Sequence, residues 1–219
     1  MLSLQKCAGL SAIAQGFIYI VAFVYFGAFW HYPLNASAVE QMTYLAENQQ
    51  VFSLICILMY VVFGVLLAVL VTGLYVRFRQ QPDSLATLGS LFGVIWVGLV
   101  IASGMIATIG LAQAIKLMAV DPEKALDLWR VVSVLTESLG GGNELVGGMW
   151  VLLISLAAKQ HAVLPPKLNY LGYVVGVAGI ATLYPAEIFT EIFGITQIVW
   201  FMWLGGYCLW AKKEWQSAG

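Results

Sequence analysis

The sequence predicts an all-α membrane protein, a single domain over residues 1–219 in which six helices cross the bilayer. Three observations predict this fold. The 219 residues are 61% hydrophobic and only 10% charged, whereas soluble domains carry roughly 25% charged residues. Several apolar runs reach the length of about 20 residues that crosses a hydrocarbon core of about 30 Å. The basic residues also alternate along the chain as a membrane topology requires.

Six apolar segments meet the length requirement. They are expected at about residues 7–30, 51–76, 85–115, 131–158, 168–184 and 188–211. The first is too long for the roughly 7–15 residues of a signal-peptide core, so it is expected to remain as a spanning helix. The fourth is the least regular, because Glu137, Asn143 and Glu144 interrupt it and its apolar body covers only 145–158.

An amphipathic outer helix is expected at about 123–135, leading into the fourth segment. Asp121-Pro122-Glu123 combines an N-cap residue, a first-turn proline and an acid near the positive helix end. In the first outer loop, Ser37 followed by Glu40 is the pattern of a capping box. Both patterns predict helices that start outside the membrane.

The distribution of Lys and Arg predicts the orientation. With six crossings, seven of the ten fall on one side and three on the other, namely Lys6, Arg77, Arg79, Lys159, Lys167, Lys212 and Lys213 against Lys116, Lys124 and Arg130. The positive-inside rule then puts both termini in the cytoplasm. The expected location is the inner membrane of a bacterial cell.

Several functional classes are disfavoured by composition. A net charge of −1 argues against a nucleic-acid surface. Cys7, Cys56 and Cys208 are too far apart in sequence to suggest a disulfide framework or a metal site. His31 and His161 are expected on opposite sides of the membrane, so they cannot form a haem or metal pair. No cofactor is expected, and no sequence motif indicates an enzyme.

Two GxxxG patterns, Gly89–Gly93 and Gly172–Gly176, predict faces where helix backbones approach closely. Packing within the bundle and a dedicated dimer face are both compatible with them.

The candidate polar site is centred on Glu144. An ionisable residue inside a bilayer is costly and usually faces protein or a water-filled cavity. Glu137 lies seven residues earlier on the same helical face, and the intervening glycines would admit a neighbouring helix or break the helix. Glu144 should lie roughly 21 Å above the cytoplasmic end of its helix. An alternative is a neutral carboxyl bonded to a neighbouring helix.

Other polar residues map to a similar height and complete an expected outward-facing acidic vestibule. The candidate ligand-binding residues are Glu144, Asn143, Glu137, Gln113, Glu191 and Gln197. The alternative is that Glu137 and Glu191 are solvated interface carboxylates and that Gln113 and Gln197 bond helices together. Nine of the eleven acids fall in or near the outer half, all but Asp83 and Glu214, so a cationic small ligand or a proton is the expected cargo.

The sequence leaves three function classes open. The first is a small transporter or ligand-binding protein with an acidic pocket at Glu144. The second is a structural or assembly subunit of a larger membrane complex, which would imply a partner subunit or a homo-oligomer. The third is a membrane-embedded enzyme acting on a lipid or an apolar small molecule. The bilayer itself is a partner in all three.

Three passages carry a resemblance to a known family: Lys6-Cys7-Ala8-Gly9-Leu10 with Ile18-Tyr19; Gly148-Met149-Trp150; and Leu164-Pro165-Pro166-Lys167-Leu168 with Leu171-Gly172 and Gly176. Across nearly its whole length the chain resembles an uncharacterised bacterial family of small six-helix membrane proteins, a domain of unknown function. Members of that family often carry two consecutive basic residues in the first passage, where Gln5 here precedes Lys6. The resemblance implies the fold and a bacterial membrane location, and no activity or site.

Overall fold

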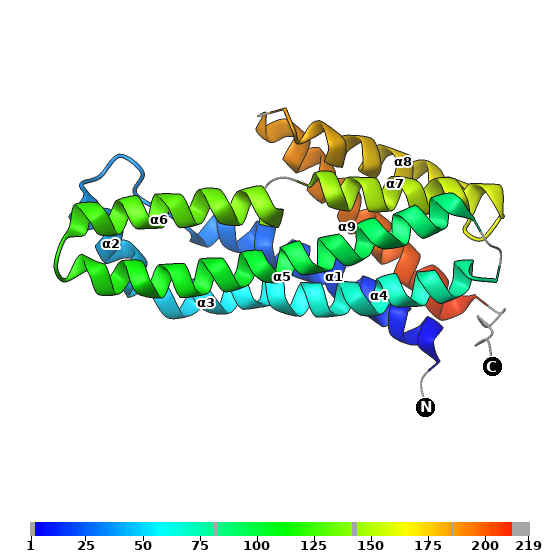
Figure 1. The fold of residues 1–219 in the computed structure, drawn as a ribbon, viewed down its shortest axis with the longest axis horizontal. Coiled ribbons are helices and arrows are strands. Elements are labelled where there is room, and N and C mark those ends of the chain that lie inside the picture. The colour runs from blue at the N-terminus through cyan, green and yellow to red at the C-terminus, as the bar shows by residue number, and fades with distance from the viewer. Residues whose placement is uncertain (1–2, 81–82, 142–143, 185, 212–219) are drawn as a thin grey trace.

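The computed structural model describes residues 3–80, 83–141, 144–184 and 186–211, and within these ranges its regular structure is helical without a β-strand (Figure 1). In chain order the elements are α1 (Leu4–Val24), η1 (Tyr25–Phe29), α2 (Ala38–Glu47), α3 (Gln49–Cys56), η2 (Ile57–Val62), α4 (Phe63–Phe78), α5 (Ser84–Met118), α6 (Pro122–Thr136), η3 (Glu137–Gly141), α7 (Leu145–Gln160), α8 (Pro166–Ala181) and α9 (Glu187–Trp210). The label η marks short stretches of the wider π-helix. The expected all-α fold is confirmed over these residues.

Five helical stretches in the described ranges are long and apolar enough to cross a membrane: Leu4–Phe29, Gln49–Phe78, Ser84–Met118, Pro122–Gln160 and Ile188–Trp210. The protein is therefore a helical membrane protein. The segment expected at 168–184 forms α8, which has only 16 residues. At 1.5 Å per residue it reaches about 24 Å, short of the hydrocarbon thickness of about 30 Å. The helix α7 is equally short, and it is counted only as part of the longer stretch Pro122–Gln160. Length and composition therefore support five crossings over the described residues.

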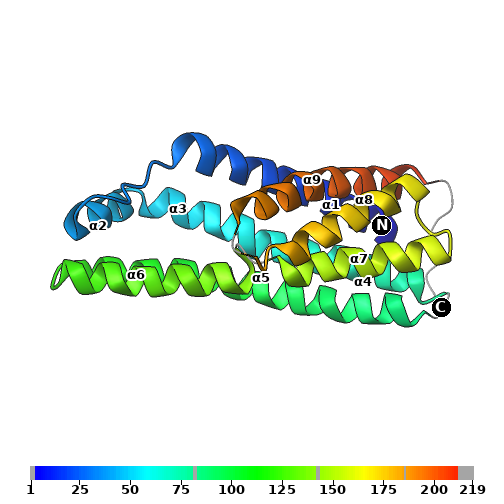
Figure 2. The same ribbon diagram turned by 90° about the horizontal axis from the view of Figure 1, so that it is seen from above.

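Six helices form a closed ring that we call the inner bundle. Around it α1 packs on α4, α4 on α5, α5 on α7, α7 on α8, α8 on α9, and α9 back on α1. Both views show these helices side by side (Figure 2). The start of α1 meets the end of α9, where Gln5 Nε2 donates to the Cys208 carbonyl at 2.8 Å. Buried aromatic side chains fill the centre of the ring.

Glycines let the helices of the inner bundle touch. A Cβ added to Gly148 of α7 would lie 2.8 Å from the Cα of Gly179 and 2.9 Å from the carbonyl oxygen of Gly176, both on α8. A Cβ added to Gly93 of α5 would lie 2.7 Å from Trp150 Nε1. Both GxxxG patterns thus face neighbouring helices of the same chain, so each packs within the bundle rather than presenting a free dimer face.

The remaining helices form an outer lobe, made of η1, α2, α3, α6 and the last part of α5. Figure 1 shows α2, α6 and the end of α5 extending beyond the ends of α7, α8 and α9. The lobe has its own apolar core, separate from that of the bundle: Ala38, Met42, Leu45, Phe52, Cys56, Ala107, Leu111, Ala114, Ala125, Leu126, Trp129 and Val132. These residues hold α2 and α3 against α5 and α6.

Both predicted outer helix starts are confirmed. At α2 the Ser37 side chain accepts from the Glu40 backbone N–H, and the Glu40 carboxylate accepts from the Ser37 N–H at 3.0 Å. These bonds lower the pKa of Glu40. At α6 the Asp121 side chain accepts from the Lys124 N–H at 3.1 Å, with Pro122 in the first turn. Local sequence therefore determines where these helices begin.

The expected helix over 131–158 is interrupted. After α6 the chain forms η3, where Gly140 has non-helical dihedral angles of φ 164° and ψ 16°. The next helix, α7, begins at Leu145. The break allows α6 to follow α5 outward while α7 joins the ring of the inner bundle.

At the opposite end, Asp83 caps the start of α5. Its carboxylate accepts from the backbone N–H groups of Leu85 and Ala86 at 2.6 and 3.1 Å, and from His161 Nε2 at 2.6 Å. Burial by itself would raise the pKa of Asp83. The hydrogen bonds from His161 and the two backbone amides outweigh it and lower the pKa of Asp83 below its ordinary value. This carboxylate thus ties the start of α5 to the end of α7.

Candidate functional site

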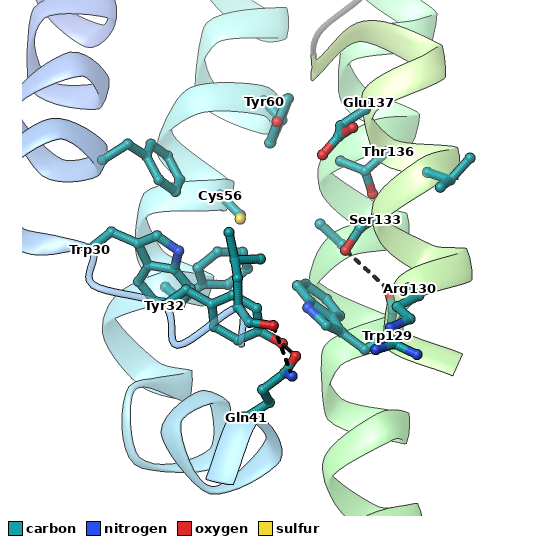
Figure 3. A pocket seen from close by; sticks show the side chains of 15 residues that line it. Trp30, Tyr32, Gln41, Cys56, Tyr60, Trp129, Arg130, Ser133, Thr136 and Glu137 are labelled. Carbon is teal, nitrogen blue, oxygen red and sulfur yellow. Dashed lines mark hydrogen bonds between the residues drawn. The ribbon is translucent and has the colours of Figure 1, made fainter. Parts of the chain in front are cut away.

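A large cavity lies in the outer lobe, between η1, α2 and α3 on one side and α6 on the other (Figure 3). Its volume is about 570 Å³, within the range of small-molecule sites. The lining residues of this outer pocket are Phe26, Trp30, Tyr32, Leu34, Gln41, Phe52, Cys56, Tyr60, Ala107, Trp129, Arg130, Ser133, Val134, Thr136 and Glu137. Most of the wall is aromatic or apolar.

The aromatic walls of the outer pocket are braced against one another. Trp30 stacks on Tyr32 with ring centroids 6.1 Å apart and planes 7° apart. Trp30 also meets Phe52 at 4.8 Å, and Phe52 meets Trp129 edge to face at 5.7 Å. Such contacts hold rings in fixed orientations. The pocket is therefore preformed.

Several polar side chains at the walls are also fixed. Tyr32 donates to Gln41 Oε1 at 3.0 Å, while Gln41 Nε2 donates to the Ala36 carbonyl at 2.8 Å. Burial raises the pKa of Tyr32, although Arg130 acts in the other direction, so the phenol keeps the proton it donates. Ser133 and Thr136 bond to carbonyls one turn back on α6. Their oxygens keep lone pairs that can accept from a ligand.

The charged lining residues lie at opposite ends of the outer pocket. Figure 3 shows Glu137 beside Tyr60 at one end, and Arg130 near Gln41 at the other. Arg130 pairs with Asp127 at 3.2 Å. Glu137 takes part in none of the ion pairs found among the described residues. The end of the outer pocket nearer the bundle therefore has the carboxyl group of Glu137 without a basic partner among the described ion pairs.

A second, smaller cavity of about 60 Å³ lies deeper, where the outer lobe meets the inner bundle. The lining residues of this inner pocket are Ile18, Tyr19, Ala22, Met59, Tyr60, Phe63, Trp96, Val100, Gly140 and Glu144. Tyr60 lines both pockets. The segment η3 also contributes lining residues to both pockets, with Glu137 in the outer pocket and Gly140 in the inner one.

Glu144 is the only charged lining residue of the inner pocket among those described. Its side chain is buried, with 8% of its surface exposed, and its Oε2 has no hydrogen-bond partner. Its backbone N–H donates to Thr182 Oγ1 at 3.0 Å, which holds the start of α7 against the end of α8. Glu144 was expected to face protein or a cavity rather than lipid, and its burial beside the inner pocket agrees with that expectation.

The other expected site residues are not gathered around Glu144. Glu137 lies in the neighbouring outer pocket. Gln113 and Glu191 are exposed, on α5 and α9, and line neither pocket. Gln197 is buried in α9, but its side-chain nitrogen and oxygen have no hydrogen-bond partner in the described part of the chain. Asn143 lies outside the described residues. Helical depth placed these residues at similar heights, but it could not give the face of the bundle on which each one lies.

The aromatic lining is what sequence reasoning missed. Trp30, Tyr32 and Trp129 line the outer pocket, although none of them was among the expected ligand-binding residues. A signal for this existed on α6, where Trp129, Ser133 and Thr136 share one helical face. For Tyr60, the signal is a hydroxyl-bearing ring deep inside an apolar segment.

Comparison with protein-family models, with curated proteins and with solved structures found no match to this chain.

Proposed function

We propose that this protein is a small transporter or ligand-binding protein of the bacterial inner membrane, and that its outer pocket takes a small amphipathic cation. The observation that carries the proposal is the preformed aromatic cavity of about 570 Å³ with the carboxylate of Glu137 at one end. Ligand sites are typically concave and largely apolar, with a few polar groups that orient the ligand.

The chemistry of the walls favours a positive charge joined to an apolar body. Tryptophan and tyrosine rings attract cations over their faces, and most strongly when water is excluded. Glu137 adds a full negative charge without a basic partner in the described ion pairs. The lining residue that could repel a cation, Arg130, pairs with Asp127 at the far end.

We further propose six crossings, with α8 as the fifth and both termini in the cytoplasm. The position of α8 in the closed ring of helices supports this count. The exposed face of α6 changes from charged at Asp127 and Arg130 to apolar at Val131, Val134 and Leu135. That change is expected where a helix passes from water into lipid, so the outer pocket would open at the outer surface. A cysteine placed at Val39, which is exposed on α2, should react with an impermeant reagent outside the cell and one placed at Gln80 should not, and the reverse pattern would contradict this topology.

The binding proposal is tested by blocking the outer pocket and identifying what copurifies. Ser133 lines the pocket, and Ser133→Phe should fill it. Ser138 is the matched control, because it also bonds to a carbonyl one turn back but is exposed and does not line the pocket. Each protein is purified in a mild detergent, and bound molecules are extracted and identified by mass spectrometry.

Wild type and Ser138→Phe should release the same organic cation in near-stoichiometric amount, and Ser133→Phe should release little of it. Identical extracts from all three proteins, or no bound molecule in any, would contradict the proposal. A second polypeptide present in stoichiometric amount without any small molecule would favour the structural-subunit alternative instead.

A further inference from the structure

The inner pocket has the composition of a site for a positively charged nitrogen. Four of its lining residues are aromatic, namely Tyr19, Tyr60, Phe63 and Trp96, and Glu144 supplies a carboxylate. These residues come from four helical elements, α1, η2, α4 and α5, so the rings surround the cavity from several directions. Aromatic cages of this kind recognise ammonium ions, because each ring face is negative.

The ring geometry keeps the cage open. Phe63 meets Tyr19 with centroids 5.5 Å apart and planes at 79°, and meets Trp96 at 5.8 Å and 69°. Rings at such steep angles form adjoining walls, whereas parallel rings would close on one another. Phe63 and Trp96 also pack against Phe201 and Trp150, respectively, with ring centroids 5.9 and 5.6 Å apart. Collapse of the cage would therefore disturb the centre of the inner bundle.

Glu144 lacks the partner that a buried carboxylate requires. Burying a charge is costly unless it is paired and hydrogen-bonded. Its Oε2 is buried without a hydrogen-bond partner, and it takes part in none of the ion pairs among the described residues. The other lining groups next to it are rings, aliphatic side chains and Gly140. Among the described residues, no lysine, arginine or histidine lines this pocket.

We propose that the inner pocket binds an ammonium group, either a protonated amine or a methylated ammonium, between the aromatic cage and Glu144. The ammonium group supplies the missing counter-charge of Glu144, and the ring faces replace its water. This inference rests on the proposed function in one respect, which is that the ligand enters through the outer pocket, past Tyr60 and η3.

The size of the inner pocket fits a head group rather than a whole ligand. A volume of about 10–15 Å³ on the same measure holds one water molecule, and this cavity measures about 60 Å³. It therefore has room for a nitrogen with a few attached carbons. A larger apolar body would remain in the adjoining outer pocket of about 570 Å³.

The test compares choline with 3,3-dimethylbutan-1-ol, in which carbon replaces the charged nitrogen without changing the shape. Binding to the purified full chain is measured by isothermal titration calorimetry in a maltoside detergent, because lipids with ammonium head groups would compete. We expect choline to bind the wild type about tenfold or more tightly than the neutral alcohol. Equal affinity for the two probes, or no binding of choline, would overturn the inference without any variant.

Glu144→Gln keeps the shape of the side chain and removes its charge, so it should weaken choline binding about tenfold. Glu191→Gln is the matched control, because the Glu191 carboxylate is exposed on α9 and lines neither pocket, and it should change choline affinity by less than about threefold. Should Glu144→Gln fail to fold, Phe63→Leu removes one ring face and should also reduce the preference for choline. Unchanged choline binding in Glu144→Gln would mean that Glu144 is only a structural carboxyl.

The two proposals fail separately. Should choline not bind while Ser133→Phe still removes a copurifying cation, only the inner ammonium site is wrong. Should Ser133→Phe change nothing in the extracts as well, the outer pocket is not the ligand site either.

Discussion

The inner bundle and the outer lobe are both built from apolar helices, but their helices pack in different ways. In the bundle, Gly148 sits against Gly176 and Gly179, so two backbones meet without intervening side chains. In the outer lobe, aromatic rings bridge the space between segments: Trp30 meets Phe52 at an interplanar angle of 35°, and Phe52 meets Trp129 edge to face. Small residues let backbones meet and leave little space, whereas bridging rings keep helices apart. The outer pocket accordingly lies between the aromatic side chains of the lobe, and the inner pocket lies where the two kinds of packing meet.

The largest effect expected from this comparison concerns two tryptophans. Trp150 is fully buried between Trp96 and Trp200 in the bundle, so Trp150→Ala should lower the free energy of unfolding by about 3–5 kcal/mol. Trp129 already borders a cavity, and Trp129→Ala should cost only about 2 kcal/mol. Unfolding in mixed micelles titrated with sodium dodecyl sulfate measures both. Equal losses would mean that the two regions are packed alike.

A smaller effect is expected from glycine substitution. Gly148→Val would force a side chain against the backbone of α8, and overpacking of this kind costs about 1–3 kcal/mol. Gly98 on α5 is the control, because a Cβ there meets no atom within 4 Å. Gly98→Val should leave the unfolding midpoint nearly unchanged. A tolerated Gly148→Val would show that close contact between α7 and α8 is not required.

The smallest effect concerns the turn at Asp83, where the bundle is held by charge. The pKa of Asp83 is lowered below its ordinary value of 3.8, so the folded state binds fewer protons than the unfolded state near that pH. The stability contributed by Asp83 is therefore present above about pH 4 and is lost as the pH falls through the lowered pKa. Asp83→Ala should cost about 1 kcal/mol at neutral pH, the usual value of an N-cap.

The pH dependence of stability distinguishes the contribution of the charge of Asp83 from that of its hydrogen bonds to the start of α5. Asp83→Asn keeps an oxygen that can accept from Leu85 and Ala86 but cannot ionise. Its deficit relative to the wild type should shrink as the pH is lowered from 7 to 3. A deficit that stays constant over this range would mean that the contact with His161 does not depend on the charge of Asp83.

Much of the fold could be predicted because it depends on local or one-dimensional signals. Apolar length marked the long helices, and Ser37 with Glu40 and Asp121 with Pro122 marked helix starts. The interruption near Gly140 could be suspected from its glycines. The length of α8 and the sharp division between α6 and α7 could not, because they depend on how α7 packs against α8.

The candidate site was only partly predictable, for a geometric reason. Glu144 stood out because a carboxyl inside an apolar segment requires a protein or water environment. Its surroundings come from α1, η2, α4 and α5, and sequence gives the depth of a residue in a membrane but not its direction around the bundle. Gln113 and Glu191 accordingly point outward, while Tyr19, Phe63 and Trp96, which resemble ordinary core residues in the sequence, surround the cavity.

The most direct test of an outward-facing cation pocket uses Ser133→Cys in a Cys56→Ala background, because Ser133 lines the outer pocket and is partly exposed whereas Cys56 is buried. Intact cells are treated with two impermeant methanethiosulfonates, one carrying a trimethylammonium and one a sulfonate, and each rate is divided by its rate with a free thiol. We predict that the cationic reagent modifies the introduced thiol about tenfold faster, since a negative cleft concentrates cations. Glu137→Gln should reduce that ratio, and Cys56→Ala alone should show no labelling. No modification from outside, or a faster reaction with the anionic reagent, would contradict the account.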